Sequence, residues 1–518
     1  MKKILLLLLI SIFCKIEINA QSPTWADDIA CIVYNKCSAC HNPDGVGPFS
    51  LMSYNEAFIF RGSIKNATGE KRMPPWNAKS ALVDYVDDLS LTDEEINLIA
   101  EWVDSGAAQG DPATAPDAPV FEGSEEITNP DVTIQFPEYT SEAVDEDDYR
   151  CFVEPWPTTQ YEWVIGTEVI PGNKSIVHHN LFAWDPTNTA INLDAADPGP
   201  GYYCFGNNGS SSSFQVGGWV PGAGASILPD GFGFQLPPGG NIIIQTHFPE
   251  GSAGQSDDTK INFRFSEESN LRRVKGGAVI NHNYSLTNGP LFIPANTEKT
   301  FYAQETATEK MTVFSLTPHM HLIGVAIKAF AVTPTDDTLH LVDIPQWDFD
   351  WQYTYQLKNP VLIPQGSIIY GEAHYDNTSN NPLNPSNPPV DVGLGEATTD
   401  EMFLVFINWV TYQPGDENLY FEDSPPLVNC GVVSTIEPSI EKLVRVFPNP
   451  ATNQVRLSYD GTFSGQVEIF DSNGRMVRKA ENIDLPANVS LNELADGVYF
   501  LKLTNEKMSF MKRVVVNQ

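Results

Sequence analysis

Five of the nine histidines fall into three short groups that could bind a metal ion. His319 and His321 are two residues apart, so a β-strand would place both imidazoles on the same face. His178 and His179 are adjacent, and they could share an ion only where the backbone twists or bulges. His247 ends an apolar run and could supply a third nitrogen. Imidazole ligands alone are compatible with zinc, copper, iron or nickel.

A second group of residues has the spacing for covalent haem attachment, because Cys37, Cys40 and His41 form a C-x-x-C-H motif. Two thiols one helical turn apart can reach the two vinyl groups of a porphyrin, and the next histidine then lies under the iron. The alternative is a redox or zinc C-x-x-C motif beside an accidental histidine. Met73 is the expected second axial ligand, since two prolines would stiffen its loop and a thioether raises the reduction potential. Met52 is the competing candidate.

The first twenty residues are typical of a secretory signal peptide. Lys2 and Lys3 precede a mostly apolar run that is too short to span a bilayer, and Ala20 offers a small residue for cleavage. Lipidation at Cys14 is disfavoured because the bulky Phe13 precedes it. We therefore expect an exported protein, secreted or attached to the cell surface.

Export permits disulfide bonds. Four further cysteines, Cys31, Cys151, Cys204 and Cys430, allow three pairings that the sequence cannot decide. Cys151–Cys204 is preferred because both residues lie in the same candidate domain.

Length and composition limit the class of protein. A chain of 518 residues is too long for one hydrophobic core, so three or four domains are expected. The formal net charge is −36, with 66 acidic against 30 basic residues. That charge would repel a phosphate backbone and excludes nucleic acid as a partner.

The pattern of residues changes along the chain. Residues 24–108 are expected to be helical, and Leu91–Ser105 is the clearest amphipathic helix, with Thr92 and Glu95 forming a capping box. Residues 109–126 are rich in proline, alanine and acidic residues, which is typical of a linker.

The rest of the chain is expected to be all-β. Short apolar or alternating runs, split by Gly, Pro, Asn and Asp, predict two jelly-roll-like β-sandwiches over residues 127–268 and 269–433. Residues 440–518 are expected to form a separate small β-sandwich. The predicted fold class is therefore multidomain: a small all-α domain, two β-sandwiches and a C-terminal β-sandwich.

The order of the histidine groups resembles the type II, ascorbate-dependent copper monooxygenases, the family of peptidylglycine α-hydroxylating monooxygenase and dopamine β-monooxygenase. The matching stretches lie between Tyr149 and Trp409, and they are HHN at residues 178–180, QTH at 245–247, HMH at 319–321 and DEM at 400–402. Residues 24–108 resemble a small class I cytochrome c. The whole is similar to bacterial proteins that fuse such a cytochrome to a monooxygenase core.

The resemblance implies two copper sites facing each other across a cleft, one in each β-sandwich. The implied ligand sets are His178, His179 and His247 for the first copper, and His319, His321 and Met402 for the second. The first site would store an electron, and the second would be where dioxygen and substrate meet. Three imidazoles tolerate both copper oxidation states, whereas two imidazoles with a thioether favour Cu(I). The implied reaction is hydroxylation of a C–H bond, with two electrons consumed per dioxygen.

Two positions depart from the peptidylglycine enzymes. Thr317 stands where those enzymes have an arginine for a substrate carboxylate, and Phe406 stands where they have a tyrosine. A C-terminal peptide glycine is therefore not the expected substrate, and an apolar or uncharged molecule is favoured. Of the other histidines, His374 is expected to be a satisfied core residue, and His282 and His340 to lie on the surface.

A cytochrome joined to this core could deliver electrons one at a time from an external donor, an ascorbate-like reductant or a redox protein. The linker would hold it at an effective concentration on the order of millimolar. The expected order is haem, then the three-histidine copper, then the methionine copper. Two alternatives stay open: a copper-binding electron carrier or copper-capture protein without turnover, and a zinc-binding adhesin.

Residues 440–518 resemble the C-terminal sorting domain of the type IX secretion system. The matching features are Pro448-Asn449-Pro450, Gly497–Leu501 and Lys512–Val516. The resemblance implies export across an outer membrane by that machinery, and the alternative is one more adhesive β-sandwich.

Overall fold

The computed structural model describes residues 22–430 except 44, 80–81, 122–124 and 206. Further along, it describes residues 444–447, 451–459, 464–471, 475–492, 494–495, 497–504 and 509–516. The expected signal peptide and the Pro448-Asn449-Pro450 motif lie outside these residues. The chain divides into two compact units, Met1–Asn429 and Cys430–Gln518, which are described separately.

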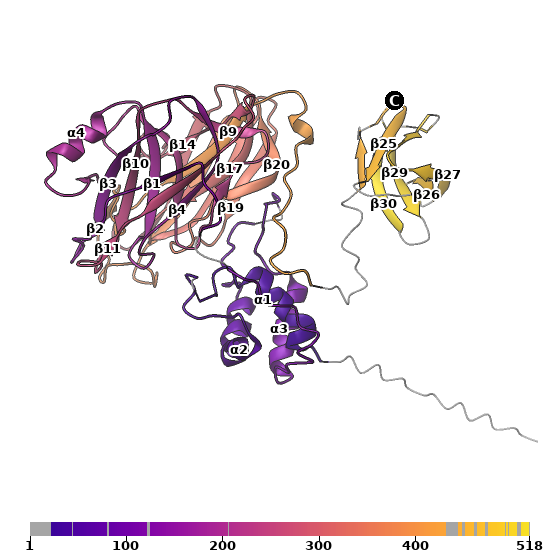
Figure 1. Cartoon of the computed structure of the whole chain (residues 1–518), viewed down its shortest axis with the longest axis horizontal. Helices are drawn as coiled ribbons and strands as arrows, with labels where there is room; N and C mark the ends of the chain where they lie inside the picture. Colours follow the sequence, from indigo (N-terminus) through magenta and orange to yellow (C-terminus); the bar gives the residue numbers. More distant parts are fainter. Residues whose placement is uncertain are drawn as a thin grey trace, which may run out of the picture. The chain divides into compact units, whose positions relative to one another are not determined.

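The first unit begins with a small helical module. Its helices are η1 (Trp25–Ile29), α1 (Ala30–Lys36), α2 (Tyr54–Gly69) and α3 (Asp93–Asp104) (Figure 1). The predicted capping box is present: the Thr92 hydroxyl accepts from the backbone N–H of Glu95, whose carboxylate accepts from the backbone N–H of Thr92. Trp102 of α3 is fully buried, with its ring 6.1 Å from that of Trp25. The module therefore has an aromatic core of its own.

Two sheets follow the helical module, in the strand orders β1-β12-β4-β9-β13 and β6-β3-β10-β5-β7. The strands are β1 (Val132–Gln135), β2 (Tyr139–Thr140), β3 (Asp148–Pro155), β4 (Glu162–Ile170), β5 (His179–Asp185), β6 (Tyr202–Tyr203), β7 (Phe214–Trp219), β8 (Ser226–Ile227), β9 (Phe232–Leu236), β10 (Asn241–Phe248), β11 (Ser256–Asp257), β12 (Lys260–Phe265) and β13 (Arg272–Arg273). Helix α4 (Thr189–Ala196) joins β5 to β6. Phe182, Ile244 and Phe263 are buried in one hydrophobic cluster between these sheets. Strand β10 is buried along its whole length, including its polar residues Gln245, Thr246 and His247.

Two more sheets follow, in the orders β14-β23-β17-β20 and β16-β21-β18-β19. The strands are β14 (Lys275–Asn281), β15 (Phe292–Ile293), β16 (Thr297–Thr306), β17 (Met311–His319), β18 (Gly324–Val332), β19 (Thr338–Ile344), β20 (Tyr355–Ile363), β21 (Ile368–Asn377), β22 (Val392–Gly393) and β23 (Leu404–Thr411), followed by η2 (Asp416–Asn418). Their shared core contains Leu316, Ile327, Ala373 and Val405. The β-sandwich architecture predicted from the sequence is thus present.

The helical module is docked on the second pair of sheets by more than a linker. Trp76 and Tyr85, between α2 and α3, are buried in the hydrophobic core of those sheets. Tyr85 pairs with Leu357 as an antiparallel bridge, which covers the edge strand β20. The sequence predicted attachment through a linker, and the structure adds a second attachment. The segment after α2 contributes apolar side chains to the core of the sandwich.

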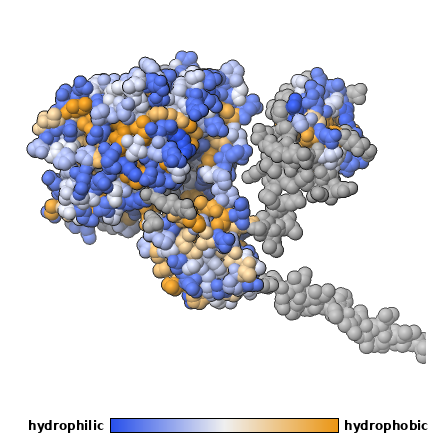
Figure 2. Space-filling model, viewed as in Figure 1, coloured by the Kyte–Doolittle hydropathy of each residue, from blue (hydrophilic) through white to orange (hydrophobic). Residues whose placement is uncertain are grey.

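A largely hydrophilic surface (Figure 2) and the lack of long apolar helices among the described residues are consistent with the composition of the chain, whose formal net charge is −36. Figure 2 shows that the visible face of the first unit is largely hydrophilic, with scattered hydrophobic patches. Among the described residues, no helix is long and apolar enough to cross a membrane.

The second unit is a small β-sandwich, as predicted. Its sheets have the orders β24-β25-β28 and β27-β26-β29-β30. The strands are β24 (Val444–Phe447), β25 (Gln454–Tyr459), β26 (Ser464–Asp471), β27 (Met476–Asp484), β28 (Ala487–Ser490), β29 (Gly497–Thr504) and β30 (Ser509–Val516). Leu457, Ile469, Leu501 and Val514 are buried in its core.

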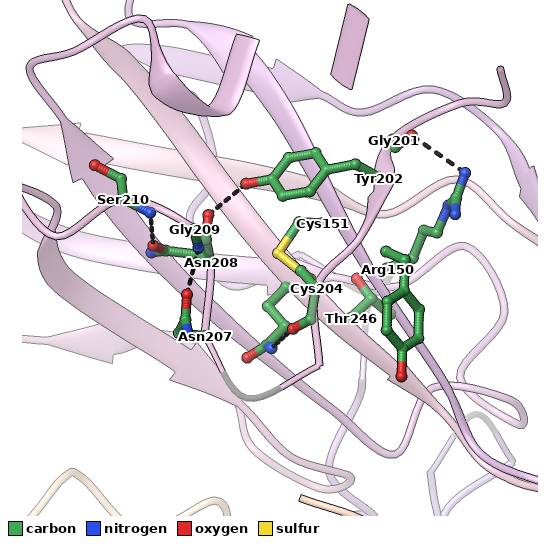
Figure 3. Close-up of a disulfide and its surroundings, with 12 residues drawn as sticks. Arg150, Cys151, Gly201, Tyr202, Cys204, Asn207, Asn208, Gly209, Ser210 and Thr246 are labelled. Carbon is green, nitrogen blue, oxygen red and sulfur yellow. Dashed lines mark hydrogen bonds between the residues drawn. A yellow bond between two sulfur atoms is a disulfide. The ribbon is translucent and has the colours of Figure 1, made fainter. Parts of the chain in front are cut away.

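The preferred disulfide pairing is confirmed. Cys151 on β3 is bonded to Cys204, which follows β6, with a Cα–Cα distance of 5.7 Å (Figure 3). The Gln245 amide of β10 donates to the carbonyl of Cys204 at 2.8 Å, which fixes the segment to the neighbouring strand. The disulfide bond therefore closes a long loop of the chain that contains α4.

Replacing both Cys151 and Cys204 with alanine is expected to lower the free energy of unfolding by about 4 kcal/mol. The bond joins residues 53 apart in sequence, and the loop-closure entropy of the unfolded chain scales with that length. Urea unfolding would measure the loss, and reduction of the wild-type bond should produce a similar one. An unchanged unfolding midpoint in both experiments would contradict this role.

Candidate metal centre

Three histidines of the first pair of sheets come together. His247 on β10 lies opposite His179, the first residue of β5. His178 precedes that strand, and its backbone N–H donates to the carbonyl of His247 at 2.9 Å. Because His178 lies outside the regular strand, its ring is free to turn toward the same place as that of His179. One ligand atom from each of the three residues lies within 4.8 Å of the others.

The ring nitrogens of this group suit a cation. The Nδ1 atoms of His178 and His179 are 3.2 Å apart, and the buried Nδ1 of His247 has no hydrogen-bond partner among the described residues. On the other side of its ring, His247 Nε2 lies 3.2 Å from Asp147 Oδ2. The ring of His247 also stacks on that of Tyr149, with centroids 4.3 Å apart. A carboxylate behind an imidazole fixes the orientation of the ring for metal binding.

His319 and His321 lie at the end of β17, and both use Nδ1 for a contact within the protein. His319 Nδ1 contacts the Gln352 side-chain oxygen, and His321 Nδ1 lies 3.1 Å from the carbonyl oxygen of Asp400. The two ring centroids are 5.1 Å apart. If each Nδ1 carries the proton of its hydrogen bond, each Nε2 is left as a free ligand atom.

Met402 is held beside this pair by the backbone. Leu404 lies opposite His319 in the β17–β23 pairing, and continuing that register by two residues brings Met402 opposite His321. The buried carboxylate of Glu401 accepts from the backbone N–H groups of His321 and Met402, at 2.9 and 3.2 Å. Burial raises the pKa of Glu401 to about 8, although these backbone donors oppose the rise. Glu401 therefore ties the two segments together.

The two ligand sets adjoin. The nearest rings, those of His179 and His319, have centroids 6.5 Å apart. Phe349 stacks on His178 at 4.9 Å and meets His321 edge-on at 5.9 Å. The resemblance implied sets that face each other across a cleft. Phe349 therefore contacts one histidine of each set.

His178, His179, His319 and His321 are neutral near pH 7. Burial lowers the pKa of both His178 and His319 to about 4, and it lowers those of His179 and His321 well below the usual value. The charges of neighbouring histidines add to this in His178, His179 and His321. Neutral imidazole is the form that binds metal ions, so no proton has to be displaced at neutral pH.

The C-x-x-C-H motif lies at the end of α1. Cys37 and Cys40 are the free cysteines among the described residues. Burial raises the pKa of Cys37 to about 12, so it is a thiol at neutral pH. His41 Nδ1 lies 2.9 Å from the carbonyl oxygen of Phe49, which leaves Nε2 available as a ligand atom. Met73 follows α2 and its side chain is 41% exposed, so its thioether is not committed to the protein core.

The three remaining histidines lie in different surroundings. His340 is exposed, as expected, and His374 lies 3.0 Å from the Thr300 hydroxyl, half-buried. The surface prediction for His282 is wrong, because its side chain is only 9% exposed and its Nδ1 accepts from the backbone N–H of Phe403. Nothing in the sequence signals this burial, because it depends on the pairing of the end of β14 with the start of β23.

Replacing His282 with asparagine is expected to flatten the loss of stability in acid. Burial lowers the pKa of His282 to about 4, whereas a histidine in an unfolded chain titrates near about 6.5. The unfolded chain therefore gains a proton first, so stability is full above about pH 6.5 and is lost as the pH falls toward 4. Urea unfolding over this range would measure the difference. Equal slopes for wild type and His282→Asn would refute the assignment.

Thr317 and Phe406, the two positions at which this sequence differs from the peptidylglycine enzymes, are neighbours in the structure. Thr317 lies opposite Phe406 in the β17–β23 pairing, two residues before His319. The Thr317 hydroxyl makes a hydrogen bond of 2.7 Å with the hydroxyl of Thr354. This position therefore presents a hydroxyl beside an aromatic ring, and neither side chain is charged.

Sequence reasoning missed the side chains that orient the histidines. Asp147, Gln352 and Glu401 contact His247, His319 and the backbone of His321, respectively. Asp147 and Gln352 are far from these histidines in sequence and belong to no motif. Glu401 could have been found, since it stands beside Met402 in the DEM stretch.

Comparisons with known proteins match two parts of the chain. Residues 285–426 match the family model described as copper type II ascorbate-dependent monooxygenase, C-terminal domain. Residues 445–517 match that of the secretion system C-terminal sorting domain. The first match includes His319, His321 and Met402 and begins after the three-histidine set. No curated protein matches the chain.

Similarity to solved structures is low. PNGF-II is 9% identical with a TM-score of 0.25, and the alignment covers 54% of this chain and 66% of that one, just under two thirds. The infectious bursal disease virus VP2 subviral particle is 10% identical with a TM-score of 0.16, covering 59% and 78%. The adhesin domain of Epf from Streptococcus pyogenes is 10% identical with a TM-score of 0.11, covering 45% and 80%. Similarities this low indicate neither the fold nor the function of this chain.

Proposed function

We propose that this exported, copper-dependent monooxygenase hydroxylates a C–H bond of an apolar or uncharged substrate, with electrons supplied through a c-type haem on its own helical module. The match of residues 285–426 supports the reaction class, and the sorting domain supports export. The proposed copper chemistry rests on one observation: five histidines from three distant segments of the chain come together.

The chain offers a ligand set for each of two copper ions. The sets are His178, His179 and His247, and His319, His321 and Met402. The copper ions, when bound, supply the one-electron redox chemistry that activates dioxygen. Asp147 and Gln352 orient the rings of His247 and His319, and the surrounding apolar side chains limit the access of water.

The residues before the H-x-H pair favour an uncharged substrate. Thr317 and Phe406 lie side by side on the strands that carry His319 and lead to Met402. A threonine hydroxyl and a phenyl ring cannot neutralise a carboxylate, so binding a charged substrate here would leave that charge without a partner. Thr317 can instead donate or accept a hydrogen bond.

The helical module is suited to electron supply. Cys37 and Cys40 keep free thiols for a porphyrin, and the contact of His41 with Phe49 leaves a ring nitrogen for the iron. Met73 is the proposed opposite ligand. Burial of Trp76 in the sandwich core holds the module against the monooxygenase sheets, so that each transfer needs no diffusional encounter. The external donor would be an ascorbate-like reductant or a redox protein, and type IX secretion machinery would recognise the C-terminal unit.

Isotope-labelled dioxygen tests the reaction. Copper-loaded protein with bound haem would be given a reductant and a panel of apolar and uncharged substrates under labelled dioxygen. One labelled oxygen atom per product molecule, detected by mass spectrometry, is the expected result. Bound, redox-active copper with no labelled product across the panel would favour the alternative, a copper-binding electron carrier or copper-capture protein.

A further inference from the structure

The connection between β19 and β20 is rich in aromatic residues. Trp347, Phe349, Trp351 and Tyr353 alternate along it, and Tyr355 opens β20. We refer to residues 347–355 as the aromatic segment. All five rings are buried or half-buried, and those of Trp351 and Tyr353 stack with centroids 5.2 Å apart and planes 5° apart. No proposed copper or haem ligand belongs to this segment, so ligand binding alone does not account for it.

One end of the aromatic segment lies against the helical module. The ring of Trp76 is 5.3 Å from that of Tyr353 and 5.2 Å from that of Tyr355. Trp76 lies three residues after Met73, the proposed haem ligand, so these ring contacts join the loop that would hold the haem to the aromatic segment.

Cys40 lies at the boundary between the helical module and the sheets. A methyl group placed on Gly222, between β7 and β8, would lie 3.8 Å from Cys40 Sγ and 3.4 Å from Val46. A porphyrin bonded to that sulfur would lie near this boundary, and Trp76 provides the contact from the helical module to Tyr353.

The other end of the aromatic segment reaches the histidines. The Gln352 side chain is 8% exposed, and its Nε2 donates to the carbonyl of Phe349 at 2.9 Å. That bond fixes the amide so that its oxygen contacts Nδ1 of His319. Phe349 itself stacks on His178 at 4.9 Å between centroids.

We propose that the aromatic segment carries electrons from the haem to the copper ion held by His319, arriving at Tyr353 and leaving through Gln352. The inference rests on the proposed function. Each transfer moves one electron from a ferrous haem to a cupric ion, with no atom or proton exchanged. Two transfers supply the two electrons of one turnover, and the external donor re-reduces the haem after each.

Two contacts could pass an electron from the aromatic segment to a copper ligand: the hydrogen bond between Gln352 and His319 and the stack of Phe349 on His178. A hydrogen bond brings two heavy atoms closer than a van der Waals contact between stacked rings, so electronic coupling through Gln352 exceeds coupling across the Phe349–His178 contact. Electrons from the haem would then reach the His319 copper without first passing through the three-histidine copper. This order differs from the one expected from the sequence.

Photochemical reduction of the haem tests the route. Oxygen-free, copper-loaded full-length protein with all centres oxidised would receive less than one electron per chain from a light-activated reductant. Re-oxidation of the haem would be followed at its visible α-band, and electron paramagnetic resonance of frozen samples would report which Cu(II) signal disappears first. Tyr353→Leu and Gln352→Leu are expected to slow haem re-oxidation several-fold, whereas Tyr353→Phe, which keeps the ring, should stay near the wild-type rate.

A second aromatic stack provides the matched control. Phe205, 41% exposed, has its ring 5.4 Å from that of Tyr149, which stacks on His247. Phe205→Leu should leave haem re-oxidation unchanged, and copper content and thermal unfolding would show that each variant is folded and loaded.

The outcomes separate the two proposals. A wild-type haem that stays reduced next to cupric ions would overturn haem electron supply, and this inference with it. Fast wild-type re-oxidation that Tyr353→Leu does not slow would overturn only the route. Loss of the three-histidine Cu(II) signal first, or slowing by Phe205→Leu alone, would place the path elsewhere.

Discussion

Replacing His247 with alanine is expected to remove one of two copper ions per chain and to lower turnover by at least about 100-fold. Loss of a side chain that merely orients a ligand already costs about 10- to 100-fold in metal affinity or activity, so loss of a proposed ligand should cost more. His247 is 1% exposed, and no described residue bonds to its Nδ1. Elemental analysis and a product assay at saturating reductant would measure both effects.

Two comparisons separate ligand loss from damage to the fold. His247→Gln keeps most of the side-chain volume but offers no imidazole, so it should lose the same copper ion while unfolding near the wild-type temperature. His340→Ala removes an exposed histidine of β19 and should keep both ions. If His247→Gln retained two copper ions per chain, the three-histidine centre would be wrong.

Local patterns in the sequence were sufficient to predict the β-sandwiches and the shared face of one histidine pair. The two-residue spacing of His319 and His321 predicts that face, and the structure brings their rings to 5.1 Å. Thr92 and Glu95 form their capping box because it needs only four consecutive residues. Where a feature depends on neighbours in sequence, the residue types determine it.

Features that depend on tertiary contacts could not be found in this way. Gln352 contacts His319 although no motif links them, and Trp76 enters a core formed by strands more than 200 residues further along the chain. Phe349 contacts one histidine of each ligand set, and it belongs to a connection whose path the sequence does not fix. His282 was misassigned for the same reason, because the strand that buries it begins at Leu404.

Docking of the helical module changes what a haem bound there could do. A flexible tether would bring the haem to many parts of the surface, and transfer would depend on how often it met the right one. Burial of Trp76 and Tyr85 in the sandwich core selects one face instead. Cys40 lies near Gly222, and the ring of Trp76 packs against that of Tyr353. The contacts therefore favour a fixed path over repeated encounters.

Replacing Cys37 and Cys40 with alanine is expected to abolish covalent haem attachment and, with it, turnover driven by a redox protein that donates only to haem. Both thiols are needed because each forms one bond to the porphyrin, and no other described cysteine is free. The proposed copper ligands lie on or beside β-strands outside the helical module, so both copper ions should remain bound. Haem absorbance in denaturant, copper content and turnover with each reductant would measure these effects.

The choice of reductant makes the result interpretable. A small ascorbate-like molecule could reduce the copper ions directly, so it should restore turnover in the Cys37→Ala/Cys40→Ala protein while the haem-specific donor does not. Wild-type protein prepared without haem should behave as the double variant does, because both lack the same group. If the double variant turned over normally with the haem-specific donor, the haem would not be the electron supply. If neither reductant supported turnover although both copper ions were bound, the helical module would be needed to hold the monooxygenase sheets in place, through the contacts of Trp76 and Tyr85, rather than to deliver electrons.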